Sequence, residues 1–217
     1  MTSNALQWGG RFANAPDAAL LRFGSSLEED FALAAFDVAC SLGHVEALQG
    51  GGVLDERQAA ALTEALRTVR AEIAEGAFVA YARAMHAEDV HGAIDARVRE
   101  IAGVTGEWLH AGRSRNDQVA TTLLLYVRDR AQVAAKASQA VAASLVRRAR
   151  EELKLQTLVA GCTHRQPAQP VLLAFILAAW SEPFVRSAKR FIGVAGDAAA
   201  SSPLGSAAFA GSNLPLD

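Results

Sequence analysis

The run from His110 to Thr122 reads HAGRSRNDQVATT and concentrates polar and charged side chains in an alanine-rich chain. Arg113 and Arg115 offer planar forks of N–H donors that match the two oxygens of a carboxylate. Asn116 adds a neutral donor, and Gly112 lets the backbone approach a ligand closely. These residue types indicate a site for a small polyanion. The same run would also serve as a polar helix start capped by one of its own side chains, so the rest of the chain must decide.

Three more polar segments occur near predicted helix ends, at residues 24–26, 88–91 and 163–169. With the first run they supply hydroxyl, imidazole, amide and guanidinium groups. Those groups can hold a dicarboxylate and move one proton. If the four segments meet in the folded protein, acid–base chemistry on a dicarboxylate is the expected function.

Other chemistries fit these residues less well. Glu88 and His91 form one E-x-x-H, the spacing used in helical di-metal sites, but such a site needs a second copy. Cys162 lies close to His164 in sequence, but nothing marks it as an activated thiolate. We therefore expect neither a metal nor a thiol mechanism.

The composition is that of a globular, helical chain. Of the 217 residues, 51% are hydrophobic and only 6% aromatic, and the abundant Ala, Leu, Arg and Glu favour helix. The net charge of −2 offers no basic surplus for nucleic acid or an anionic membrane. Two cysteines fit a reducing cytoplasm, and the first residues lack the pattern of a signal peptide. The most apolar run, residues 171–180, is about half the length of a membrane span.

Hydrophobic periodicity predicts an all-α fold. Apolar residues recur at helical spacing in three segments, which are residues 26–50, 55–76 and about 88–103. The first segment is expected to open with a capping box at Ser26, and residues up to Gly24 are expected to form an arm. An uninterrupted helix of roughly 40 residues is expected from Asp117 to Gln156, with alanines that allow close helix contacts.

The last third of the chain is predicted with less regular structure. We expect a loop at residues 158–169, then a helix from Pro170 that kinks at Pro183 and loses definition near Gly193 and Gly196. No strand pattern of any length is evident. The predicted domains are a helical N-terminal domain with an arm, residues 1–112, and the first part of a central helix bundle, residues 113–217.

Taken in order, the polar segments resemble the argininosuccinate lyase family, within the wider aspartase and fumarase superfamily. The resemblance rests on WGGRF at residues 8–12, the helix start at Ser26, EDVH at 88–91, LHAGRSRNDQVATT at 109–122, THRQPAQP at 163–170 and PLGSAAFAG at 203–211. The ordered set with WGGRF at its front favours this family over adenylosuccinate lyase, fumarase or aspartase.

The resemblance implies a β-elimination that splits argininosuccinate into arginine and fumarate, the last step of arginine biosynthesis, without metal or organic cofactor. It implies substrate binding by Ser26, Asn116, Thr163 and Arg115. His164 would act in proton transfer or in positioning the leaving guanidino group. The residues expected to support these contacts are His91, Arg113 and Gln166.

The family also implies a cytoplasmic homotetramer whose active sites each gather loops from three subunits, with no nucleic-acid or membrane partner. Its members are considerably longer, and their glycine- and serine-rich loop, with the serine usually assigned as the base, lies beyond Asp217. We therefore expect this chain to be an N-terminal portion without lyase activity of its own.

Four positions depart from the family pattern. Phe175 replaces a usual histidine, Ser187 follows an arginine where the family commonly has an aspartate, and Pro167 and Ala207 replace more usual residues. They leave a second hypothesis, a non-catalytic helical oligomer of the crystallin type. The intact binding residues matched above favour the enzyme.

Overall fold

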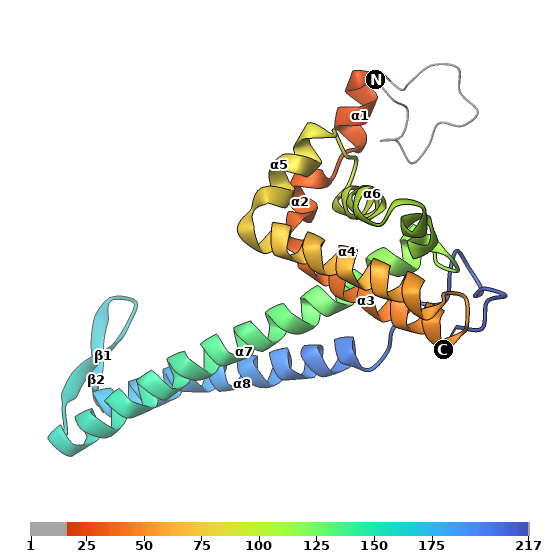
Figure 1. The fold of residues 1–217 in the computed structure, drawn as a ribbon. Coiled ribbons are helices and arrows are strands. Elements are labelled where there is room, and N and C mark those ends of the chain that lie inside the picture. Colours follow the sequence, from red (N-terminus) through yellow and green to blue (C-terminus); the bar gives the residue numbers. More distant parts are fainter. Residues whose placement is uncertain (1–16, 217) are drawn as a thin grey trace. The chain divides into compact units, whose positions relative to one another are not determined.

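The computed structural model describes residues 17–216, which form helices and one short β-hairpin (Figure 1). The all-α prediction is confirmed. By contacts the chain divides into two units: unit 1 holds the described residues up to Tyr126 and those from Ser202 onward, and unit 2 is Val127–Ser201. The WGGRF segment lies outside the described residues.

Unit 1 is built on packed helices. Its elements are α1 (Ala18–Gly24), α2 (Leu27–Asp30), a 3-10 turn η2 (Phe31–Leu33), α3 (Ala34–Gly50), α4 (Glu56–Glu75), α5 (Ala77–Ala84), α6 (Val90–Ala102), a 3-10 segment η3 (Gly103–His110) and the first part of α7 (Arg115–Leu155). Figure 1 shows α3 and α4 side by side, and the two helices share many contacts.

The core of unit 1 explains why these helices form. Leu48, Leu62, Leu66, Phe78 and Ile94 are fully buried, and burying each contributes about 1.5–3 kcal/mol. These residues come from α3, α4, α5 and α6, so the core joins helices from different parts of the sequence.

The ends of α4 follow the sequence signals. The Asp55 carboxylate accepts the Gln58 N–H at 2.7 Å, and the Gln58 side chain accepts the Asp55 N–H at 3.0 Å, which completes a capping box. Gly76, with φ of 81°, ends the helix in the left-handed conformation. The prediction for residues 55–76 is confirmed.

The start of unit 1 differs from the prediction. Residues 18–24 are not an irregular arm but the helix α1, capped by Asp17, although none of its residues is buried. The capping box at Ser26 is also wrong, because the Ser26 hydroxyl bonds to the Asp30 carboxylate and makes no bond to the helix backbone. The predicted single helix is instead α2, η2 and α3 in succession.

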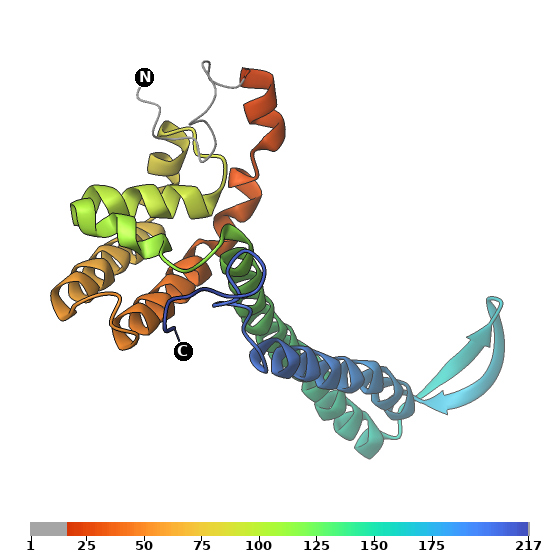
Figure 2. The ribbon, with the colours of Figure 1, turned by 90° about the vertical axis from the view of Figure 1, so that its right-hand side faces the viewer.

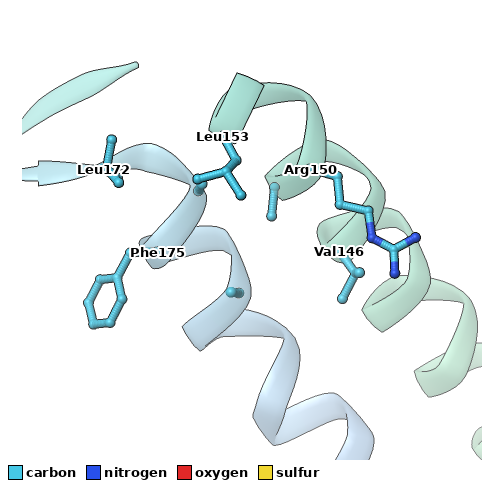
Figure 3. Close-up of a pocket in the computed structure, with 8 residues that line it drawn as sticks. Val146, Arg150, Leu153, Leu172 and Phe175 are labelled. Atoms are coloured by element: carbon cyan, nitrogen blue, oxygen red, sulfur yellow. The ribbon is translucent and has the colours of Figure 1, made fainter. Parts of the chain in front are cut away.

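Unit 2 contains the rest of α7, strands β1 (Leu158–Thr163) and β2 (Gln166–Leu172), and α8 (Leu173–Ala199). The predicted loop at residues 158–169 is wrong, because β1 and β2 form an antiparallel hairpin, shown in Figure 2. Pro170 lies in β2 and not in a helix. The expected loss of helix near Gly193 and Gly196 is also wrong, since α8 runs through both glycines and through Pro183.

Small side chains line the inner faces of the two helices of unit 2. They are Ala131, Ala135, Ala142 and Ala149 on α7, and Ala174, Ser181, Ala188 and Ala195 on α8. The α8 positions are spaced by seven residues, which keeps them on one face, and small residues let helices approach closely. Both views show α7 and α8 running side by side (Figures 1 and 2).

Candidate functional site

A buried carboxylate, Asp37 on α3, forms the centre of a polar cluster in unit 1. One of its oxygens, Oδ1, accepts hydrogen bonds from His91 Nδ1 at 2.9 Å, Gln118 Nε2 at 2.7 Å and Thr122 Oγ1 at 3.3 Å. These donors stand on α6 and α7, so Asp37 connects three helices. Burial acts to raise the pKa of Asp37, but the bond and charge from His91 and the charge of Arg113 lower it below its ordinary value.

A second carboxylate, Asp95 on α6, holds the two arginines of the RSRND run. Arg113 Nη2 donates to Asp95 Oδ1 at 3.4 Å and Arg113 Nη1 donates to Ser41 Oγ at 3.0 Å. Arg115 Nη2 donates to Asp95 Oδ2 at 3.1 Å. The Arg113 side chain is fully buried, so its guanidinium group holds other residues of the cluster in place and is not exposed to a ligand.

Arg115 is more open but is also engaged. Its Nη1 donates to Gln118 Oε1 at 2.6 Å, and its Nε lies 3.8 Å from Asp89 Oδ2. The Arg115 Nε makes no hydrogen bond to any described residue. Arg115 therefore has a guanidinium plane oriented by its neighbours, and its unbonded Nε is itself buried.

His44 fixes the backbone at the entrance to this run. Its Nε2–H donates to the Ala111 carbonyl at 2.8 Å, which assigns the proton to Nε2. Burial, reinforced by the nearby charge of Arg113, lowers the pKa of His44 to about 4. A neutral His44 thus holds the residue before Gly112, whose φ of 72° suits glycine.

Ser26 is brought beside the EDVH segment. The Ser26 N–H donates to the Glu88 carbonyl at 3.0 Å, and the Ser25 hydroxyl donates to the same oxygen at 3.1 Å. Asp89 caps α6 by accepting the Gly92 N–H. Three of the four polar segments, carrying Ser26, His91 and Asn116, therefore belong to one unit and are connected by hydrogen bonds.

The fourth polar segment, with Thr163, His164 and Gln166, lies in unit 2 at the tip of the hairpin. Thr163 pairs with Gln166, and His164 and Arg165 form the two-residue turn between them. Both turn residues have positive φ, 48° for His164 and 64° for Arg165. The side chains of all four residues, 163–166, are exposed.

Sequence reasoning did not assign site roles to Asp37, Asp95, Asp117 and Gln118. A signal for Asp95 was available, because it follows His91 by four residues and so shares its helix face. Gln118 likewise follows Arg115 by three residues. Among residues 17–216 no group of three or more His, Cys, Asp or Glu side chains is arranged to hold a metal ion.

Cys40 stands beside this cluster on α3 without joining it. Burial, together with the negative charge of Asp37, raises the pKa of the Cys40 thiol to about 11. A thiol with so high a pKa stays protonated near neutral pH and behaves as a small apolar side chain.

Comparison with known proteins places the whole chain in a family. Residues 10–217 match the family described as lyase, and the chain belongs to that family.

Relatives within the family agree in name. The chain is 43% identical to the argininosuccinate lyase of Desulfovibrio desulfuricans over 97% of its length, and 42% identical to that of Leifsonia xyli subsp. xyli over 100%. It spans only 44% of the length of each of these curated relatives. An EDDS lyase variant solved with bound fumarate has a similar structure, with a TM-score of 0.70, 25% identity and coverage of 94% of this chain and 42% of that one.

Proposed function

We propose that this chain contributes to an argininosuccinate lyase, which splits argininosuccinate into arginine and fumarate by β-elimination. The observation that carries the proposal is the identity of about two residues in five to proteins of that name across nearly the whole chain. The connected cluster around Ser26, His91 and Asn116 supports it, because the matched residues share one unit.

The chemistry of the reaction suits the residues. Removing a proton beside a carboxylate builds negative charge on that carboxylate, and preorganised N–H donors aimed at it stabilise the transition state. In the proposal, Arg115 and Asn116 bind the dicarboxylate portion and Ser26 and Thr163 add hydroxyl contacts. His164 transfers a proton or orients the leaving guanidino group.

His91, Arg113 and Gln166 are proposed to support those contacts. Two of them make internal bonds that suit such a role, His91 to Asp37 and Arg113 to Ser41 and Asp95. A donor held by a buried carboxylate keeps its orientation when charge develops nearby. No organic cofactor or metal is required by the proposal.

A homotetramer is proposed for the assembled protein. Large apolar side chains of unit 2 stay exposed, including Phe175 at 67% and Trp180 at 60%, and exposed apolar surface of this extent marks an interface. A cytoplasmic location is proposed as well. The stretch Ala18–Gly50 is long and apolar enough to cross a membrane, but its buried residues include Asp37, Ser41 and His44, as in a core helix.

A chimera tests the proposed function directly. Residues 1–217 are fused to the complementary C-terminal portion of the Desulfovibrio enzyme, and fumarate release from argininosuccinate is followed by its ultraviolet absorbance. We expect release by the chimera, none by the 217-residue chain alone, and a loss of at least a hundredfold in kcat with His164→Asn.

The matched control is Arg165→Asn, a change at the neighbouring turn position outside the proposed catalytic set, which should keep most of the activity. A folded, assembled chimera that releases no fumarate would contradict the enzyme and favour the non-catalytic, crystallin-type oligomer.

A further inference from the structure

The carboxylate of Asp117 joins two segments that are far apart in sequence. Its Oδ1 accepts the Ser114 N–H at 2.9 Å, and its Oδ2 accepts the Gly205 N–H at 3.2 Å and the Ala207 N–H at 2.7 Å. The residue is only 3% exposed. All three donors are main-chain amides, so Asp117 ties the start of α7 to the loop within residues 203–211.

The rest of the segment that follows unit 2 in sequence is packed into unit 1. This return segment, residues 202–216, lies beside the start of α7 in Figure 2. A Cβ added at Gly112 would lie 2.7 Å from Leu216 Cδ1, and one added at Gly51 would lie 2.0 Å from the Pro215 carbonyl oxygen. Leu214 and Leu216 pack against the core of unit 1. The return segment therefore occupies the space left by two glycines.

These contacts bring the loop to the proposed ligand-binding residues. Arg115 and Asn116 directly precede Asp117 in the first turn of α7, and the Asn116 N–H is itself held by Ser114 Oγ at 3.2 Å. The Asp117 bonds thus place residues 205–207 next to that turn. Gly205 and Ala207 both have positive φ, 101° and 52°, which turns their amides toward the one carboxylate.

We propose that Asp117 is a positioning residue. Its carboxylate holds the loop of residues 203–211 against the first turn of α7, so that the loop lines one side of the ligand site beside Arg115 and Asn116. The ligand part of this inference rests on the proposed function. A carboxylate suits the position because both of its oxygens accept, and its charge strengthens bonds from amide donors. The isosteric amide of asparagine would keep the shape but turn an NH2 toward N–H groups on one side.

Amide hydrogen exchange on the 217-residue chain tests the mechanical link. With Asp117→Asn we expect exchange across residues 203–211 to accelerate at least tenfold, while exchange in α3 and α4 stays unchanged. Asp129→Asn is the matched control, because Asp129 is a half-exposed carboxylate of α7 that, among residues 17–216, accepts side-chain hydrogen bonds from its neighbour Arg130 alone. Unchanged exchange at 203–211 would overturn the proposal, since packing alone would then hold the segment.

Fumarate titration of the chimera tests the link to the ligand. Asp117→Asn should weaken fumarate binding at least tenfold at temperatures where both proteins are folded, whereas a role in folding alone would lower the thermal midpoint and leave the affinity of folded protein intact. Faster exchange with unchanged affinity would overturn the role beside Arg115 and Asn116. If the parent chimera bound no fumarate, the proposed function would fail, and the exchange experiment would still decide whether Asp117 holds the return segment.

Discussion

At the scale of single residues, the candidate site depends on carboxylates that hold its donors. Asp37 collects three hydrogen bonds on one oxygen in a fully buried position, and Asp95 holds two arginines. Asp37 is fully buried and both oxygens of Asp95 are engaged by arginines, so neither carboxylate is presented to a cationic ligand. Their effect is to hold the side chains of His91, Arg113 and Arg115 in fixed orientations.

Asp37→Asn should lower the free energy of unfolding of the chain by about 2–4 kcal/mol, because it removes a buried charge from its bonded partners. Urea denaturation followed by circular dichroism measures the change. Asp129→Asn should stay within about 0.5 kcal/mol of the parent, as expected for an exposed position. Equal stabilities for the two variants would show that the Asp37 bonds contribute nothing net.

The pKa of His44 makes stability depend on pH. The unfolded residue takes up its proton near its ordinary pKa of 6.5 and the folded residue near 4, so the unfolded state binds more protons between these values. The contribution is fully present above the unfolded pKa and is lost as pH falls toward 4, at most about 3 kcal/mol. Urea midpoints measured from about pH 7 to 5 should fall less steeply in His44→Gln than in the parent. If the urea midpoints of the parent and of His44→Gln fell equally steeply with pH, His44 would be excluded as the source of the pH dependence.

Ala207 adopts a left-handed backbone at φ of 52°, which costs an L-residue about 1–2 kcal/mol and glycine little. Ala207→Gly should therefore raise the thermal midpoint slightly, equivalent to about 0.5 kcal/mol after the entropic cost of glycine. Differential scanning calorimetry is suited to this comparison. Ala208→Gly, at the next position, serves as control, and a gain there as large as at Ala207 would contradict the backbone explanation.

At the scale of elements, helices were predictable where periodicity and caps agreed. The α4 helix begins after Asp55 and ends at Gly76 as expected, and α7 spans Arg115–Leu155 against an expectation of 117–156. The hairpin was missed because its strands contain Gly161, Pro167 and Pro170, and its turn lacks the asparagine–glycine signal. The hairpin is held by main-chain hydrogen bonds, and the sequence of its strands does not show the alternation of polar and apolar residues by which strands are usually predicted.

Residue type and position near helix starts sufficed to propose binding residues, but the carboxylates that hold the cluster together could not be found in this way. Asn116 and Ser26 stand out by residue type near helix starts, whereas Asp117 reads as an ordinary N-cap. Its bonds to Gly205 and Ala207 join residues 88 and 90 positions apart, and no local pattern reports such a contact. Tertiary packing alone creates that role.

The hairpin turn offers a test at this scale. Both turn residues have positive φ, the requirement of the two-residue turns that favour glycine at the second position. Arg165→Gly should slow amide exchange at Val159 and Val171 several-fold by stabilising the pairing, without altering α4. Arg165→Pro, which cannot adopt positive φ, should accelerate the same amides. Equal exchange rates at Val159 and Val171 in the two variants would contradict a requirement for positive φ at Arg165.

At the scale of the whole molecule, unit 2 has more apolar surface than its own helices cover. Val133, Phe175, Trp180 and Ile192 are half-exposed or more, while the alanines between α7 and α8 are buried. A surface of this kind is normally covered by other helices. Unit 1, in contrast, encloses its own core of leucine, valine and phenylalanine.

We therefore expect the chain to self-associate, with a sedimentation coefficient that rises with protein concentration. Trp180→Glu should lower the association constant at least tenfold, because it puts a charge into an apolar contact. Val104→Glu is the control and should leave association unchanged, because Val104 is an apolar residue of unit 1 that is even more exposed, 79% against 60% for Trp180. A monodisperse monomer at all concentrations would contradict the interface.

The seven-residue repeat between α7 and α8 has a consequence for register. Because Ala135, Ala142 and Ala149 repeat at the same interval as Ala174, Ser181 and Ala188, sliding one helix by a heptad, about 10 Å, again places small side chains opposite small ones. The rows of small side chains determine which faces of α7 and α8 meet, but they allow more than one alignment of the two helices along their axes. The hairpin removes that ambiguity, since its paired strands and two-residue turn leave no slack between the end of α7 and the start of α8. The hairpin that carries His164 therefore also determines how α7 and α8 are aligned along their axes.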